Sequence, residues 1–298
     1  MFRFSSIFLI AIPMASGCFS NPFLNSDALL TESQRKELLE YQREVEIGRN
    51  MTGHILQFYG SNHNEKIKRY LNQIALYLGE HTDAKERRYM VALLDTKSVN
   101  VFACPGGYIL LTMGALENMK NEAELAGVLG HAIAHIEKKH LLSTLLERSK
   151  TLEKPIEIDP ILKARQRNLG RLFSDPGQNI LHYISGDTGE PAALDQATKE
   201  GLSILFETGL DKTLEYEADQ KGMQIMVRAN YDPFALMNFL SRVDKNKNTD
   251  TKNLETTHPL LKDRVAALGL KLEQMRAKDI LAAEGETRFR KRTQALRK

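Results

Sequence analysis

Apolar positions recur with a helical period along most of this chain. In the stretch 64–78, Ile67, Leu71, Ile74 and Leu78 lie three or four residues apart, which places them on one face of a helix. The same spacing, with a capping residue at the start, predicts helices over about 31–49, 121–140 and 211–229, and further helices that begin near 232 and 258. The chain is therefore predicted to be mainly helical.

Two short apolar runs break the helical period and predict β-strands. They are 89–94 and 108–112, and the segment between them ends in Pro105 followed by two glycines. Proline and glycine favour a tight turn, so we expect the two runs to pair as a hairpin. The predicted fold class is α+β, mainly helical, with a small antiparallel sheet next to the helix 121–140.

Length and composition are those of an ordinary globular protein. The chain has 298 residues, enough for one large or two small domains, and shows neither an internal repeat nor a second composition class. We therefore expect a single domain over 31–298, in which the proline-rich stretch 151–200 forms a variable insert or lid. The 41 basic and 38 acidic residues are interspersed, which argues against a nucleic-acid-binding surface.

The N-terminal stretch has the pattern of an export signal. Arg3 is followed by an apolar run too short to span a bilayer, and small residues precede Cys18. This pattern resembles the lipobox of bacterial lipoproteins, so we expect a signal peptide over 1–17, a lipid on Cys18 and a tether over 18–30. An ordinary cleaved signal peptide is the alternative, and it would leave Cys18 without a purpose.

The two cysteines and their neighbours bear on location. A lipid on Cys18 would leave Cys104 without a partner for an intrachain disulfide. We expect Cys104 to be a small packing residue. The alternative is a free thiol near the metal cleft that the helix 121–140 is expected to form. The lipid would anchor the protein in the cell envelope, and Phe19 after the cysteine, rather than Asp, favours the periplasmic side of the outer membrane.

The helix 121–140 carries the candidate chemistry. His131 and His135 lie four residues apart, so both imidazoles face the same side of the helix. Two imidazoles at this spacing can bind one zinc ion. Such a pair also arises by chance on amphipathic helices, so the zinc assignment needs support from elsewhere in the chain.

Ala132 stands where the zinc-peptidase motif H-E-x-x-H has its glutamate. The segment reads H-A-I-A-H, so two metal ligands are present and the general base is missing. General base catalysis typically contributes roughly 10²–10⁴-fold in rate. An alanine at this position is typical of a natural pseudoenzyme and also of an engineered substrate trap.

Four separated segments, taken in order, resemble those of the zinc metallopeptidases of the HtpX, BepA and CAAX-prenyl-protease type. The resemblance covers about residues 30–270 and is greatest for the minimal periplasmic lipoprotein branch. The four segments are 100–108, His131 to His135 with His140 after it, 214–219, and Thr257 to Pro259 with Arg264 after it.

This resemblance implies a zincin-type metallopeptidase domain that binds one Zn²⁺ ion per chain. It makes Glu215 the third zinc ligand beside the two histidines, and Asp219 the acid that orients one of those histidines. His258 corresponds to a histidine that approaches the metal, as a fourth ligand or as an oxyanion donor, and a purely structural role is its alternative. Glu217, two residues from Glu215, is expected to point away as a solvated or structural charge.

The predicted function is a lipid-anchored zinc metalloendopeptidase scaffold that acts on misfolded or unassembled envelope proteins. Because Ala132 replaces the general base, the alternative is an inactive zinc-binding pseudoprotease with a chaperone-like or adaptor role. Such a protein would hold extended client segments against the strand 108–112. A structural lipoprotein with a chance histidine pair is a third class, which zinc content would separate from the other two.

Overall fold

The computed structural model describes residues 31–151, 184, 191–246, 250–274 and 286–294. The expectations for 1–30, including the lipid on Cys18, and for most of the insert 151–200 lie outside these residues. The described elements are, in chain order, α1 (Glu32–Tyr59), α2 (Glu65–Gly79), β1 (Met90–Leu94), β2 (Val101–Cys104), η2 (Pro105–Gly107), β3 (Tyr108–Thr112), α3 (Met113–Glu117), α4 (Glu122–Glu137), α5 (His140–Thr151), α8 (Pro191–Ser203), η4 (Ile204–Thr208), α9 (Lys212–Arg228), α10 (Phe234–Lys245), α11 (Lys252–Thr257), α12 (Leu261–Gln274) and α13 (Glu286–Thr293). No helix in these ranges is long and apolar enough to cross a membrane.

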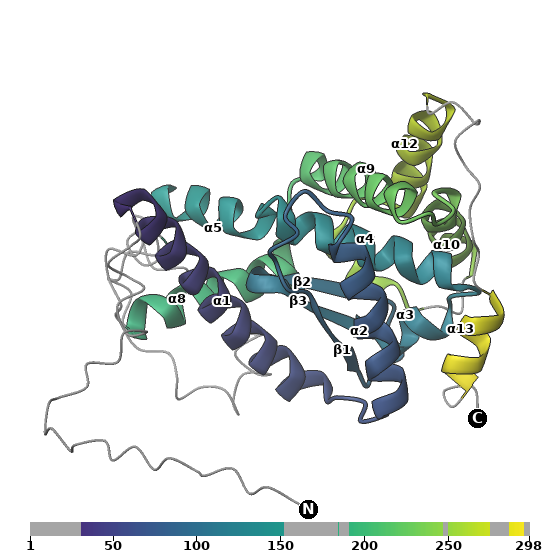
Figure 1. Ribbon diagram of the computed structural model, residues 1–298, viewed down its shortest axis with the longest axis horizontal. Coiled ribbons are helices and arrows are strands. Elements are labelled where there is room, and N and C mark those ends of the chain that lie inside the picture. Colours follow the sequence, from purple (N-terminus) through teal and green to yellow (C-terminus); the bar gives the residue numbers. More distant parts are fainter. Residues whose placement is uncertain (1–30, 152–183, 185–190, 247–249, 275–285, 295–298) are drawn as a thin grey trace, which may run out of the picture.

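The architecture is mainly helical with one small sheet, as the sequence predicts. The three strands are ordered β1-β3-β2, and the sheet lies beside α4, the helix that carries His131 and His135. Figure 1 shows the sheet in the middle of the molecule, with α1, α5 and α8 toward the left and α4, α9, α10 and α12 above it and toward the right. The α+β class and the place of the sheet are therefore confirmed.

The predicted strand pairing is wrong. β1 and β3, expected to form an antiparallel hairpin, pair in parallel, with Met90 opposite Tyr108. The hairpin partner of β3 is β2, which pairs with it in antiparallel register. Only residues 105–107 form the turn, at which Gly106 and Gly107 take φ values of 73° and 98°. Because the residues before Pro105 are themselves strand-forming, the sheet is mixed and β3 is its central strand.

Side-chain caps explain where the main helices begin. Thr31 and Gln34 form a reciprocal capping box at the start of α1, which continues to Tyr59, well beyond the expected end near residue 49. At α4 only half of a capping box forms: the Asn121 side chain accepts from the Glu124 N–H. The Glu124 carboxylate accepts instead from the Lys120 N–H and from Arg242, whose guanidinium makes a charge-assisted hydrogen bond.

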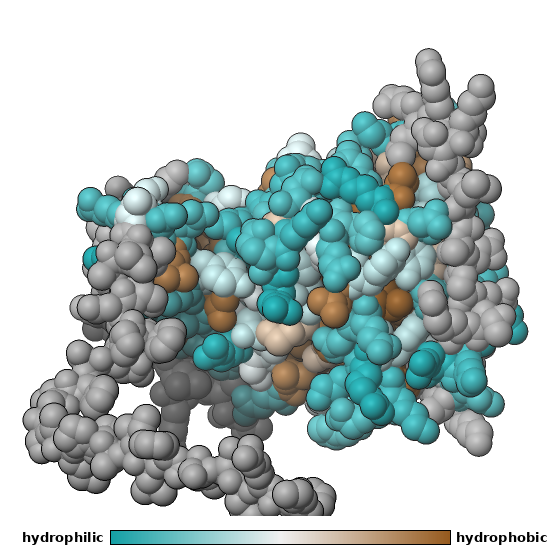
Figure 2. All heavy atoms as spheres, in the orientation of Figure 1, coloured by the Kyte–Doolittle hydropathy of each residue, from teal (hydrophilic) through white to brown (hydrophobic). Residues whose placement is uncertain are grey.

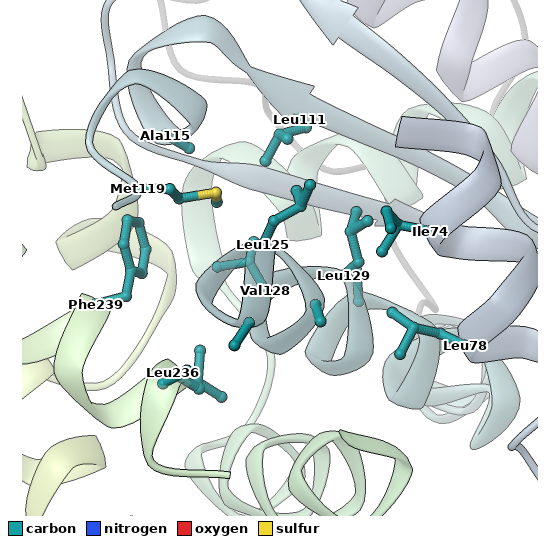
Figure 3. Packing of buried hydrophobic residues seen from close by; sticks show 14 of the residues in the cluster. Ile74, Leu78, Leu111, Ala115, Met119, Leu125, Val128, Leu129, Leu236 and Phe239 are labelled. Atoms are coloured by element: carbon teal, nitrogen blue, oxygen red, sulfur yellow. The ribbon is translucent and has the colours of Figure 1, made fainter. Parts of the chain in front are cut away.

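The two faces of the sheet bury two separate hydrophobic cores. On one face α2 and α4 cover the sheet, and α9, α10 and α12 complete the same core; on the other face α1 covers the sheet, and α5, α8 and η4 complete the second core. Figure 3 shows Leu125, Val128 and Leu129 of α4 between Leu111 of β3, Ile74 and Leu78 of α2, and Leu236 and Phe239 of α10. Every residue from Glu122 to Ile136 is buried, so α4 is enclosed on all sides and not only along the predicted face.

The outer surface carries polar groups over most of the face in view. Figure 2 shows hydrophilic residues covering much of that face, with small, separate apolar areas between them. Leu76 and Met90 are among the exposed large apolar side chains of the described residues. Scattered apolar residues of this kind are normal for a soluble surface and need no special function.

Candidate metal centre

A close crossing of α4 and α9 brings the candidate ligands together. At the crossing, Gly222 of α9 lies against Gly130 and His131 of α4, and a Cβ atom on Gly222 would stand 2.7 Å from the His131 backbone nitrogen. Only a residue without a side chain allows this approach. The crossing lets the Glu215 side of α9 face the histidine side of α4 at short range.

Three ligand atoms converge in the space between the two helices. His131 Nε2 and His135 Nε2 are 3.1 Å apart. Glu215 places Oε1 3.5 Å from His135 Nε2 and Oε2 3.8 Å from His131 Nε2. All three side chains are buried, and they form the only group of histidines, cysteines or acids within the described residues that has the spacing of a metal site.

These residues fit a zinc ion. Ligands of a tetrahedral zinc ion, each about 2.0–2.1 Å from the metal, lie roughly 3.3 Å from one another. The distances of 3.1, 3.5 and 3.8 Å agree with that geometry. Glu215 Oε2 is buried and accepts no hydrogen bond from the described residues, as expected of an oxygen that serves a metal. Burial raises the pKa of Glu215, but His258, His135 and His131 together lower it well below its usual value, so Glu215 is ionised.

A buried ion pair supports His131. Asp219 Oδ1 lies 2.9 Å from His131 Nδ1. Arg264, from α12, donates to both oxygens of Asp219 at 2.9 and 2.6 Å. Although burial acts to raise the pKa of Asp219, Arg264 and then His131 lower it to about 2. An ionised Asp219 holds the proton of His131 on Nδ1, so that the lone pair on Nε2 points to the centre.

A different kind of group supports His135. Its Nδ1 lies 3.0 Å from Nδ1 of His140, the first residue of α5. His140 is buried, and burial, followed by the neighbouring His135, lowers its pKa to about 4. A neutral imidazole therefore stands behind His135, where a carboxylate stands behind His131.

His258 lies beside the three candidate ligands. Its Nε2 is 3.6 Å from Glu215 Oε2, and its Nδ1 is 3.0 Å from the Thr257 hydroxyl. Burial lowers the pKa of His258 to about 4, so the ring is neutral at ordinary pH. The backbone before it is fixed by Gly209 (φ 71°), because a Cβ atom there would lie 2.2 Å from the Thr257 carbonyl oxygen. The structure thus places His258 at the centre, and its role as fourth ligand or oxyanion donor stays a prediction.

Ala132 lines the same narrow cleft and offers it only a methyl group. The cleft has a cavity volume of about 30 Å³. One wall is the outer edge of β2, with Val101 and Ala103, and the other walls are apolar side chains. These apolar residues come from α5, from η4 and from the segment after it: Leu141, Ile204, Leu205 and Leu210. The edge strand beside the centre is therefore β2, whereas 108–112, which was expected to be an edge strand, is the central strand β3.

Of the other residues that the sequence singled out, Cys104 lies where expected and Glu217 has contacts that were not expected. Cys104 is buried in the core with α1, and burial raises the pKa of its thiol to about 12, which agrees with a packing role. Glu217 is half exposed as expected, yet it contacts Lys138 and lies near His140. Sequence reasoning missed the contacts of Arg264 and His140, although both belong to the segments that carried the resemblance. Cys18 lies outside the described residues.

Comparisons with known proteins point to the same chemistry. Residues 61–270 match Peptidase family M48. The chain is 24% identical over 223 residues to the beta-barrel assembly-enhancing protease of Escherichia coli O157:H7, covering 73% of this chain and 41% of that protein. It is 27% identical over 215 residues to the protein of the same name from Yersinia pestis, covering 70% and 40%. It is 24% identical over 174 residues to a mitochondrial metalloendopeptidase of Arabidopsis thaliana, covering 58% and 30%. The chain spans about two fifths of the length of these bacterial relatives.

Proposed function

Since residues 61–270 make up more than half of the chain, the protein belongs to peptidase family M48, and we propose that it is a zinc metalloendopeptidase scaffold of the cell envelope. The observation that carries this proposal is the convergence of His131, His135 and Glu215 on one point between α4 and α9. The bacterial relatives are named as proteases that enhance β-barrel assembly, which supports misfolded or unassembled envelope proteins as substrates or clients.

The residues around the centre have separable roles in this proposal. His131, His135 and Glu215 would hold the zinc ion, which when bound would polarise a peptide carbonyl and make a nearby water more acidic. Asp219 and Arg264 fix the proton of His131 on Nδ1. His258 would donate to the oxygen of the carbonyl under attack, or would occupy the open ligand position.

The edge of β2 would hold the substrate. Asn100 and Thr112 form a hydrogen-bonded pair, and hydrogen-bonded and non-hydrogen-bonded pairs alternate along an antiparallel ladder. Counting from that pair, Ala103–Ile109 is a non-hydrogen-bonded pair, so the N–H and C=O groups of Ala103 point away from β3. Among the described residues, no hydrogen-bond partner occupies these outward groups, and Ala103 lines the same cleft as His131 and Glu215. An extended segment can therefore add to the sheet as a further strand beside the metal centre.

Ala132 divides the proposal into two functions. A methyl group cannot accept a proton, so this chain lacks the base that H-E-x-x-H peptidases use. With the rest of the centre in place, the second candidate is a zinc-binding pseudoprotease that holds extended client segments along β2 without cleaving them efficiently. The two functions share the metal centre and the β2 edge, and they differ only in turnover.

Substitution of Ala132 separates the two functions. Ala132→Glu should raise the cleavage rate of an unfolded protein such as casein by roughly 10²–10⁴-fold over the unmodified chain. Ala132→Gln is the matched control, because its amide has the same shape but cannot act as a base. Zinc content is measured in all three proteins. If the Glu variant binds zinc yet cleaves no faster than the Gln variant, the scaffold is a binding module.

We further propose that Cys18 carries a lipid that anchors the chain on the periplasmic side of the outer membrane. The support is the lipobox-like pattern before Cys18. In cells fed a palmitate analogue, the unmodified chain should be labelled and Cys18→Ser should not. Cys104→Ala removes the other cysteine and should leave labelling unchanged. Equal labelling of the Cys18→Ser variant would exclude the anchor.

A further inference from the structure

The turn between α4 and α5 directs another histidine, His140, back toward the metal centre. α4 ends at Glu137, and Lys139 takes a left-handed conformation with a φ of 54°. This reversal buries His140 and sets its ring 5.0 Å from the His135 ring, with an angle of 82° between the two planes. The two rings contact each other through Nδ1 atoms 3.0 Å apart.

The chemistry of the centre fixes the direction of this hydrogen bond. His135 presents Nε2 to His131 and Glu215, so Nε2 is the atom that would bind a metal. A neutral imidazole that binds through Nε2 keeps its proton on Nδ1 and donates it. His140 Nδ1 must then accept, and the single proton of His140 lies on Nε2.

The group that faces His140 Nε2 is an acid on the same helix as Glu215. Glu217 Oε2 lies 3.6 Å from His140 Nε2, and Glu217 Oε1 lies 3.2 Å from Lys138 Nζ. The Nε2 atom is buried and has no closer hydrogen-bond acceptor among the described residues. A carboxylate at this position favours the tautomer that leaves Nδ1 of His140 free to accept.

We propose that His140 is a positioning residue that orients His135 for metal binding, and that Glu217 in turn holds the tautomer of His140. This inference rests on the proposed zinc centre. It gives each of the three acids on α9 a place around that centre: Glu215 faces the metal, Asp219 supports His131 directly, and Glu217 supports His135 through His140. Glu217 is thus more than the solvated charge that its spacing from Glu215 indicates.

Zinc affinity of two contrasting variants at His140 tests the proposal. His140→Phe keeps a ring of similar size but has no acceptor, whereas His140→Gln has an amide oxygen that can accept from His135. We expect His140→Phe to weaken zinc binding by roughly 10–100-fold, the usual effect of losing a group that orients a metal ligand, and His140→Gln to restore most of it. A role in packing alone would give the reverse order.

Glu217→Gln tests the outer step at a half-exposed side chain, where folding is not at risk. It should weaken zinc binding less than His140→Phe does. Lys138→Ala is the matched control, because it removes the other partner of Glu217 and leaves His140 untouched; its zinc affinity should equal that of the unmodified chain. In the zinc-loaded protein, ¹⁵N NMR should find the His140 proton on Nε2.

The outcomes separate this inference from the proposed function. If the unmodified chain binds zinc and His140→Phe binds it equally well, the inference is wrong and the metal centre stands. A proton on Nδ1 of His140 would also overturn the inference. If the unmodified chain does not bind zinc, both the inference and the proposed function are wrong. If His140→Phe does not fold, the Glu217→Gln affinity and the NMR result decide.

Discussion

The two edges of the small sheet are built differently. On the outer edge of β1, the Asn72 side chain accepts from the Val91 N–H at 2.9 Å and donates to the Val91 C=O at 2.8 Å. Further along, the Asn62 N–H donates to the Leu93 carbonyl, and Ser61 forms a bridge to Leu94. The outer edge of β2 has only the bond from the Val101 N–H to the Asn100 side chain among the described residues.

The difference shows how a sheet can leave backbone N–H and C=O groups unpaired, or open, at one edge only. Unpaired strand edges invite pairing with other chains, and proteins usually cover them. Here the Asn72 side chain forms the hydrogen bonds that a further strand would form with β1, on the side away from the metal centre. β2 is left open, but only inside the narrow cleft beside His131 and Ala132. We infer that the open edge is the binding surface and that the closed edge prevents self-association.

Substitution of the candidate metal ligand Glu215 has the largest expected effect, and it tests whether the open edge binds clients independently of the metal. Glu215→Gln replaces a buried ligand with a side chain of the same shape, so zinc affinity should fall by more than the roughly 10–100-fold that outer-shell changes cause. If the β2 edge carries client binding, labelled casein should still bind this variant about as well as it binds the unmodified chain. Fluorescence anisotropy measures the binding and chelator competition measures the zinc. A parallel loss of both would assign client binding to the metal.

The closed edge is tested by Asn72→Ala. The change leaves the Val91 N–H and C=O without their partners, and each such group costs about 1–3 kcal/mol when it is poorly hydrated. Because Asn72 is only partly buried, we expect a total loss of about 1–3 kcal/mol in the free energy of unfolding, measured by urea denaturation, together with concentration-dependent association. Gln73→Ala, at an exposed amide on the same helix, should change stability by less than about 0.5 kcal/mol. Equal stability of the two variants would remove the distinction between the edges.

The open edge is tested by Ala103→Pro, which has the smallest expected effect. Proline removes an N–H that points away from β3, so the sheet keeps its ladder, whereas an added client strand loses one hydrogen bond. One such bond contributes about 0.5–1.5 kcal/mol, so casein should bind roughly 2–10-fold more weakly. The urea midpoint shows whether the fold is intact. Unchanged affinity in a folded Ala103→Pro protein would contradict strand addition at β2.

Local periodicity made the helices and the candidate site predictable. His131 and His135 repeat at four residues on α4, and Glu215 and Asp219 repeat at four on α9, so each pair shares a helix face. The structure brings all four together, while the zinc assignment itself remains a prediction.

Contacts between distant segments were not predictable from period or spacing. The parallel pairing of β1 with β3 depends on how residues 95–100 cross the sheet. No local pattern in that segment predicts this crossing. Glu217 lies on the opposite side of α9 from Glu215, and its partner His140 comes from another helix. His140 reaches His135 only because Lys139 takes a left-handed conformation, which lysine rarely adopts.

The backbone contact at Gly222 also bears on which ion fills the centre in a cell. Because α4 and α9 touch through glycine, their spacing cannot adjust to the size of a bound ion. The Asp219–Arg264 pair also holds the His131 ring in a fixed orientation. Two nitrogens and one oxygen at this spacing suit a small tetrahedral cation, whereas ions that demand six or more oxygens, such as calcium and magnesium, are disfavoured. Among first-row metals, affinity alone would favour copper over zinc. For the proposed centre we therefore infer that rigidity disfavours ions that need more ligands, and that metal supply in the compartment decides among the ions that fit.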